Sequence, residues 1–150
     1  MLRTAIVLVF VLSASLIVAS SASAQGAEWR PPSQQMPMMP TASELGGDWL
    51  GPRASWFNGI QGVTGVSASS LRAAGDARSG SDRAQIARFS DGPIPVVLWS
   101  DRNADGRADI IEIFRRGGVI VQLIDPDYDS NANVIRYYDA SGELLREVRM

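Results

Sequence analysis

The chain of 150 residues contains no cysteine, no histidine and no lysine, so all 14 of its basic side chains are arginines. The absence of cysteine excludes disulfides, thiolate zinc sites, cysteine nucleophiles and a lipidated amino-terminal cysteine. The absence of histidine and lysine excludes imidazole metal ligands, a Ser-His-Asp triad, Schiff-base lysines and the phosphate-binding lysine of Walker motifs. With no G-x-S-x-G, H-E-x-x-H or glycine-rich phosphate motif either, we expect a protein that is not an enzyme.

Net charge is also small, because 14 arginines stand against 16 acidic residues and leave a formal charge of -2. Both signs are interspersed, which gives no electrostatic footprint for nucleic acid. We therefore expect no nucleic-acid partner. Functional chemistry has to come from carboxylates, amides and backbone oxygens, on a chain long enough for one small domain.

The amino terminus has the pattern of a secretory signal peptide. Arg3 precedes a mostly apolar run at 5–18, which is shorter than the roughly 20 residues that a transmembrane helix needs. The sequence Ala-Ser-Ala at 22–24 provides the small residues that a signal peptidase requires. These features predict a signal peptide over 1–24 and an exported protein, periplasmic or extracellular, with no transmembrane segment after cleavage.

Residues 25–47 are rich in proline, glutamine and methionine, a composition that predicts a disordered linker. Met36, Met38 and Met39 also offer thioether sulfurs to Cu(I), although no histidine or cysteine supports such a site. Of these two interpretations, we expect the linker.

Residues 48–82 begin with tryptophans and continue with glycine, serine and alanine, which predicts a flexible segment. Its start, Gly-Asp-Trp-Leu-Gly-Pro-Arg followed by a Gly-Ile pair within 47–60, resembles the opening of carbohydrate-selective outer-membrane porins. A porin barrel needs about 16 strands of about ten residues each. The chain is too short for that barrel, so the resemblance does not make it a porin and reflects either shared ancestry of an amino-terminal segment or, as we favour, chance.

From residue 83 to 150 the sequence consists of short β-type runs bounded by turn formers. The predicted strands are 85–89, 94–99, 110–114, 119–124, 134–138 and 143–148. The expected fold is therefore mainly β, a small antiparallel β-meander of short hairpins behind a signal peptide and a largely disordered linker.

Two units of this β-rich region repeat at an ungapped spacing of 24 residues, with an acidic loop at the start of each. The first loop carries oxygen donors at alternate positions, and Gly106 allows the tight wrap that brings such donors together. We expect it to bind Ca²⁺, which takes six to eight oxygens. The expected ligands are Asp101, Asn103, Asp105, the carbonyl of Arg107, Asp109 and Glu112.

The run Asp-x-Asn-x-Asp-Gly-x-x-Asp resembles the calcium loop of EF-hands and the FG-GAP-type repeats of exported bacterial β proteins. Strands predicted on both sides favour the second resemblance, which implies calcium held on a β framework. The second loop has Ser130 in place of the turn glycine and Arg136 in place of Glu112, so we expect its site to be weaker. Its candidate ligands are Asp125, Asp127, Asp129, Asn131 and Asn133.

The sequence thus favours an exported, non-catalytic calcium-binding β module with a structural or interaction role toward a protein or glycan of the envelope or the cell exterior. The alternative is a metal-free envelope interaction or assembly protein that uses its sheet surface and exposed tryptophans. Trp49, Trp56 and Trp99 are the candidates for that contact.

Overall fold

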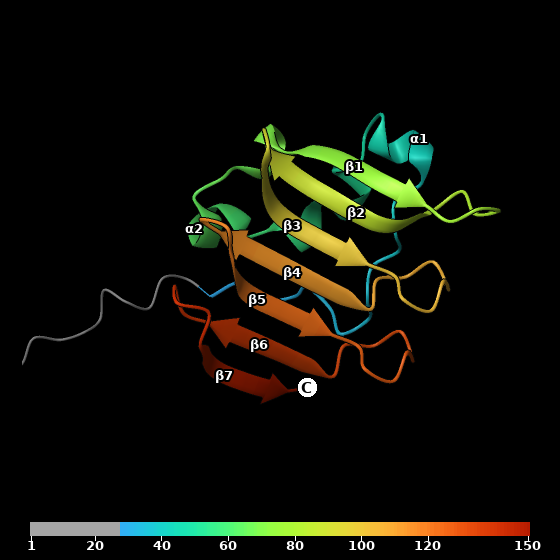
Figure 1. The fold of residues 1–150 in the computed structure, drawn as a ribbon. Coiled ribbons are helices and arrows are strands. Elements are labelled where there is room, and N and C mark those ends of the chain that lie inside the picture. Colours follow the sequence, from blue (N-terminus) through green and yellow to red (C-terminus); the bar gives the residue numbers. More distant parts are fainter. Residues whose placement is uncertain (1–27) are drawn as a thin grey trace, which may run out of the picture.

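The computed structural model describes residues 28–150, and the predicted signal peptide lies outside this range. The described part forms one seven-stranded antiparallel sheet in which each strand pairs with the next along the chain (Figure 1). The strands are β1 (Arg72–Ala77), β2 (Ala84–Asp91), β3 (Ile94–Ser100), β4 (Ile110–Arg115), β5 (Gly118–Ile124), β6 (Val134–Tyr138) and β7 (Leu144–Arg149). The predicted meander is confirmed.

All six predicted strands are present, and β1 is a seventh that the sequence did not predict. Its sequence, Arg-Ala-Ala-Gly-Asp-Ala, lacks the β-branched and aromatic residues that mark strands. It forms because it pairs along its whole length with β2. The prediction of a flexible segment over 48–82 is corrected accordingly.

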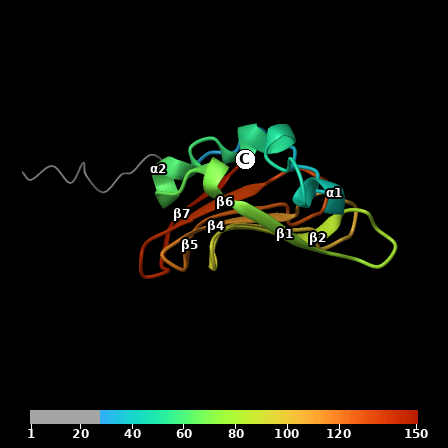
Figure 2. The ribbon, with the colours of Figure 1, turned by 90° about the horizontal axis from the view of Figure 1, so that it is seen from above.

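One face of the sheet is covered by the amino-terminal part of the described chain (Figure 2). That cover contains four short helical elements: α1 (Ala42–Leu45), η2 (Gly51–Phe57), α2 (Ile60–Thr64) and η3 (Ala68–Ser70). No helix of the described residues is long and apolar enough to cross a membrane.

The core lies between the cover and the sheet and is largely aromatic. The ring of Phe89 lies 4.8 Å from Trp49, 5.0 Å from Phe57 and 5.3 Å from Trp99, measured between ring centroids. Trp49 and Trp99 are buried, and Trp56 is partly buried against the same cluster. These tryptophans therefore hold the cover on the sheet, which corrects the expectation that they are exposed for a partner.

The predicted linker is also part of the fold. Residues 34–42, which we call the strap, run along one end of the sheet and hydrogen-bond to the three connections at that end, β1–β2, β3–β4 and β5–β6. Met36 and Met39 are completely buried, whereas Met38 is 38% exposed. For the described residues 28–47, the prediction of a disordered linker is corrected, and the buried sulfurs belong to the core.

The strap fits the sheet because its spacing matches that of the hairpins. Its six backbone hydrogen bonds are Met36 N to Ser130 O, Met39 N to Gly106 O, Ala42 N to Asp82 O, Ala132 N to Gln34 O, Ala108 N to Pro37 O and Ala84 N to Pro40 O. Each step takes three residues of strap and 24 residues of sheet. Three extended residues advance about 9.3 Å, close to the roughly 9.6 Å of two strand spacings.

This spacing identifies a third repeat unit that the sequence comparison missed. The units are 77–100, 101–124 and 125–148, and each consists of a connection, a strand, a turn and a strand. Register shifts fall at matching places, after Phe89, Ile113 and Tyr137. Buried alanines recur at 84, 108 and 132. The first unit was missed because it lacks the acidic residues of the other two.

Candidate functional site

The two acidic loops lie at the same end of the sheet, beside the β1–β2 connection and under the strap (Figure 1). We call residues 101–109, between β3 and β4, loop A, and residues 125–133, between β5 and β6, loop B. Strands β4 and β5 lie between the two loops, which are therefore two strands apart along this end of the sheet. The structure therefore stacks the predicted ligand loops next to each other.

Loop A is closed by its own carboxylates. Asp101 is 4% exposed and accepts hydrogen bonds from the backbone N–H groups of Ala104 (2.7 Å) and Gly106 (2.9 Å). Asp109 is 1% exposed and accepts from the N–H groups of Arg102 and Asn103. These two buried carboxylates hold the turn of loop A through four backbone N–H groups.

Loop B has the same architecture. Asp125 is 1% exposed and accepts from the N–H groups of Tyr128 (2.9 Å) and Ser130 (2.8 Å), at the positions that Ala104 and Gly106 occupy in loop A. The φ angles agree too, at 63° and 87° in loop A against 62° and 72° in loop B. Ser130 thus adopts the left-handed conformation of its glycine counterpart, and the loop closes without glycine.

The structure gathers metal-type ligand atoms in loop B. One carboxylate oxygen each from Asp125, Asp127 and Asp129 lies within 4.8 Å of the others, and the side chains of Asp127 and Asp129 are exposed. Within residues 28–150, the carboxylates of loop A form no such group. The loop that the sequence ranked second therefore has the tighter cluster, and calcium binding by loop A stays a prediction.

Several predicted loop A ligands have other partners. Glu112 lies inside β4, where it accepts a hydrogen bond from the Gln122 side chain of β5 at 2.9 Å. Arg107 donates from its guanidinium to the carbonyl of Met36 in the strap at 2.7 Å, and its N–H donates to Asp105. Asn103 also donates to Asp105. The structure does not bring Glu112 together with the loop carboxylates, because strand β4 begins at Ile110.

The asparagines of loop B support its carboxylates. The N–H of Asn131 donates to Asp129 at 2.8 Å. The Asn133 amide nitrogen, in the orientation that satisfies both of its polar atoms, donates to Asp127 and to the carbonyl of Asn131, each at 3.1 Å. Asn133 therefore orients a carboxylate, as a donor, rather than joining the cluster as an oxygen ligand.

Burial raises the pKa of Asp109 and of Asp125 above the ordinary value for aspartate. The neighbouring Asp127 raises the pKa of Asp125 further, and the backbone N–H groups that each carboxylate accepts act in the opposite direction. Loop B holds three aspartates and no arginine, whereas loop A holds Arg102 and Arg107. The negative charge of loop B is therefore neutralised less by arginines within the loop than that of loop A.

The structure adds a side chain that the sequence reading passed over. Arg83 donates to the carbonyl of Met39 at 2.7 Å, as Arg107 does to Met36, one repeat and three strap residues away. The shared sequence Arg-Ala-x-Ile at 83–86 and 107–110 is the signal that could have revealed this pair. Both guanidinium groups therefore fasten the strap to the sheet.

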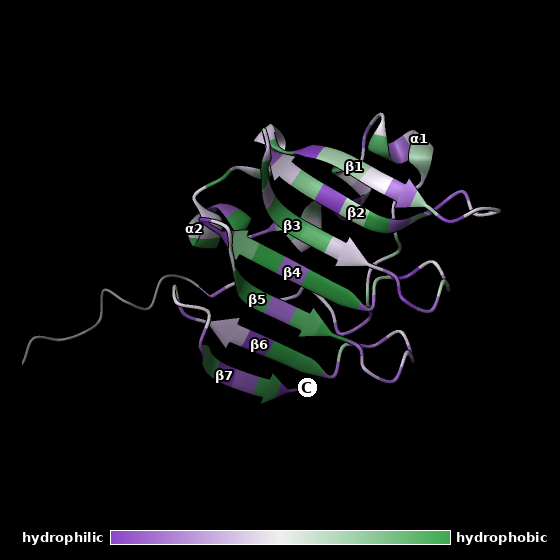
Figure 3. Ribbon diagram, viewed as in Figure 1, coloured by the Kyte–Doolittle hydropathy of each residue, from purple (hydrophilic) through white to green (hydrophobic). Residues whose placement is uncertain are grey.

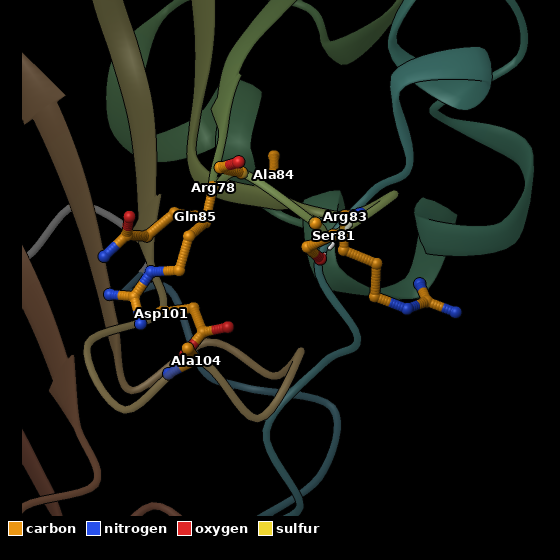
Figure 4. A pocket seen from close by; sticks show the side chains of 9 residues that line it. Arg78, Ser81, Arg83, Ala84, Gln85, Asp101 and Ala104 are labelled. Carbon is orange, nitrogen blue, oxygen red and sulfur yellow. Dashed lines mark hydrogen bonds between the residues drawn. The ribbon is translucent and has the colours of Figure 1, made fainter.

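A cleft of about 230 Å³ opens between the β1–β2 connection and loop A. Figure 4 shows Arg78 and Gln85 pointing into it above Asp101 and Ala104, while the guanidinium of Arg83 points away. Asp101 accepts two backbone N–H groups, and the other polar side chains that line the cleft are those of arginine, serine and glutamine.

No family model, curated protein or solved structure matches this chain.

Proposed function

We propose that the protein is an exported, non-catalytic β module that binds Ca²⁺ through its acidic loops, foremost loop B. The observation that carries this proposal is the cluster of Asp125, Asp127 and Asp129, whose oxygens lie within 4.8 Å of one another. Hard divalent cations prefer carboxylate oxygens in such loops. Two carboxylates about 4 Å apart repel by roughly 4 kcal/mol at an effective dielectric of 20, and a cation offsets this repulsion.

In loop B, Asp127 and Asp129 would hold the ion from the exposed side, with Asp125 below them. Three carboxylates supply at most six oxygens, so water would complete the shell and the affinity would be modest. Modest affinity suffices outside a cell, where calcium is plentiful. The bound ion would fix loop B where it leaves β5 and would stabilise this end of the sheet for contact with a protein or glycan partner.

The test is isothermal titration of CaCl₂ into the purified protein, with Asp127→Asn and Asp129→Asn as loop B variants. Both side chains are exposed, so these variants should fold normally. We expect binding by the wild type, at least tenfold weaker binding by each variant, and a higher Tm with calcium. Calcium at ten times Kd adds about 1.4 kcal/mol to the free energy of unfolding.

Asp105→Asn, at the repeat position of Asp129, is the matched variant in loop A and separates the two loops. If it alone abolishes binding, loop A is the site and our assignment to loop B is wrong. If the wild type gives no heat with millimolar calcium and its Tm is unchanged by a chelator, the protein does not function through calcium.

The second candidate function is metal-free interaction through the sheet. In the described residues, the helical elements lie on one face of the sheet and leave the other open (Figure 2). Figure 3 shows hydrophilic bands across the middle of β4 to β7, where Glu112, Gln122, Arg136 and Glu147 lie in register. Hydrogen bonds join Glu112 to Gln122 and Gln122 to Tyr138. Two results together would favour this function: a Tm that does not change when a chelator is added, and loss of partner binding in the Gln122→Ala variant.

A further inference from the structure

The two edge strands of the sheet have different neighbours. At one edge, α1 lies against β1, and Leu45 of that helix packs over Gly75 on the face of the strand, where a Cβ would lie 2.6 Å from it. At the other edge, β7 pairs with β6 and with no other strand of the described chain. An unpaired edge strand presents free backbone donors and acceptors to other chains.

Apolar side chains gather at this open edge. The large hydrophobic side chains exposed among the described residues are Met38, Ile94, Tyr128, Leu144, Leu145 and Met150. Three of these six belong to β7 or follow it directly, with exposures of 53% for Leu144, 67% for Leu145 and 39% for Met150. Exposed apolar groups beside an unpaired strand mark an edge open to association. In the register argued below, Met150 lies within the paired residues 146–150, whereas Leu144 and Leu145 lie outside them.

The sequence of β7 is self-complementary in one antiparallel register. A twofold axis perpendicular to the sheet keeps every side chain on its own face, and opposed residues in an antiparallel pair share a face. The regular part of β7 therefore allows axes at Arg146, Glu147 or Val148, because Leu145 is the extra residue of a bulge.

Charge selects among these three registers. An axis at Arg146 or at Glu147 places like charges directly opposite each other, which is unfavourable. An axis at Val148 places Val148 against its own copy and Glu147 against Arg149 of the second copy, twice. The side chain of Arg149 is 83% exposed and its ion pair with Glu147 of its own chain is long, at 3.6 Å, so it can turn toward the second copy.

We propose that β7 is a docking edge for a second copy of this chain, which adds its own β7 antiparallel in the register centred on Val148. The two sheets then form one continuous sheet of two molecules. This contact buries little area and depends on exposed ion pairs, so the association is weak and decreases with salt. It lies at the edge strand and does not depend on calcium.

Charge reversal tests the register. By sedimentation equilibrium in low salt, with chelator present, we expect the wild type to form dimers. Glu147→Arg and Arg149→Glu should each lower the association constant at least tenfold, because each places like charges opposite. Mixing the two variants should restore association as a heterodimer, since the arginine at 147 of one variant then faces the glutamate at 149 of the other, and the unchanged Arg149 and Glu147 face each other in the second contact. Arg149→Glu is the cleaner arm, because Glu147 also accepts a hydrogen bond from Arg136.

A crosslink gives an independent readout. The chain has no cysteine, so Val148→Cys introduces the only thiol. In the proposed register this residue lies on the axis opposite its copy, within the Cα separation that a disulfide requires. We expect Val148→Cys to form a disulfide-linked dimer on mild oxidation and Leu145→Cys to stay largely uncrosslinked.

Three results would overturn the proposal. One is a wild type that stays monomeric at millimolar concentration. Another is association that survives both single charge reversals, since a different surface would then be responsible. The third is a mixture of the two reversed variants that fails to associate although both variants melt cooperatively.

Discussion

At the residue scale, loops A and B have the same backbone conformation although their sequences differ at a key position. Gly106 and Ser130 occupy the same position in the repeat and have φ angles of 87° and 72°. Glycine adopts this conformation without strain, whereas another residue there costs on the order of 1 kcal/mol. Each loop begins with an aspartate, Asp101 or Asp125. This aspartate accepts two backbone N–H groups and so stabilises the same backbone conformation in both loops.

We predict that Ser130→Gly raises the free energy of unfolding by about 1 kcal/mol, because it removes left-handed strain from loop B. The matched control is Gly106→Ser in loop A, which should lower stability, since a Cβ there would lie 3.2 Å from the Arg83 side chain. Urea denaturation of both variants measures the two changes. Equal midpoints for Ser130→Gly and the wild type would show that the strain is absent.

The site residues were predictable from the sequence only in part. Alternating acids mark the loops, and both loops are where the pattern placed them. The sequence could not show that Asp101 and Asp109 accept backbone N–H groups or that Glu112 pairs with Gln122 across the sheet. Those partners depend on strand register, which spacing along one loop does not contain.

At the element scale, the strap is the part that sequence reasoning interpreted wrongly. Its composition is typical of disorder, and it has neither the period of two that marks strands nor the 3.6 that marks helices. Its period is three, with Met36 and Met39 both buried. A period of three has meaning only beside a sheet whose hairpins repeat, so the strap could not be recognised before its neighbours were placed.

We predict that Met36→Ala and Met39→Ala each lower the free energy of unfolding by about 2 to 4 kcal/mol, because each leaves a cavity beneath the strap. Met38→Ala is the matched control, one or two residues away on the exposed side, and should change stability by less than about 0.5 kcal/mol. Thermal or urea denaturation makes the comparison. Similar losses at all three positions would contradict the burial described for the strap.

At the scale of the whole molecule, the strands pair locally in sequence, whereas the cover is held on the sheet by contacts between residues far apart in sequence. Every strand pairs with its neighbour in sequence, and this pattern could be predicted because turn formers separate the apolar runs. The cover could not, since Trp29, Trp49 and Phe57 lie in segments with little regular pattern. Their partners are far away: the Tyr137 hydroxyl donates to the carbonyl of Trp29 across 108 residues.

We predict that a chain beginning at residue 72 keeps the sequence of all seven strands but does not fold cooperatively. Without the cover, the inner face of the sheet, with Phe89 and Trp99 among its residues, would be exposed to water. The expected signs are a weak near-ultraviolet circular dichroism signal, dye binding to apolar surface and a broad thermal transition. A sharp transition with unchanged near-ultraviolet signal would show that the sheet is stable alone.

The contact between Trp29 and Tyr137 also sets an order of events during synthesis. Trp29 and the strap leave the ribosome long before β6. These apolar residues therefore lack their last packing partner in the nascent chain while the hairpins are synthesised one after another. The last partner of the first segment is synthesised only with β6. The fold therefore cannot close before that strand has been made, and a stalled chain lacking the hairpin of β6 and β7 would remain open to proteases and chaperones.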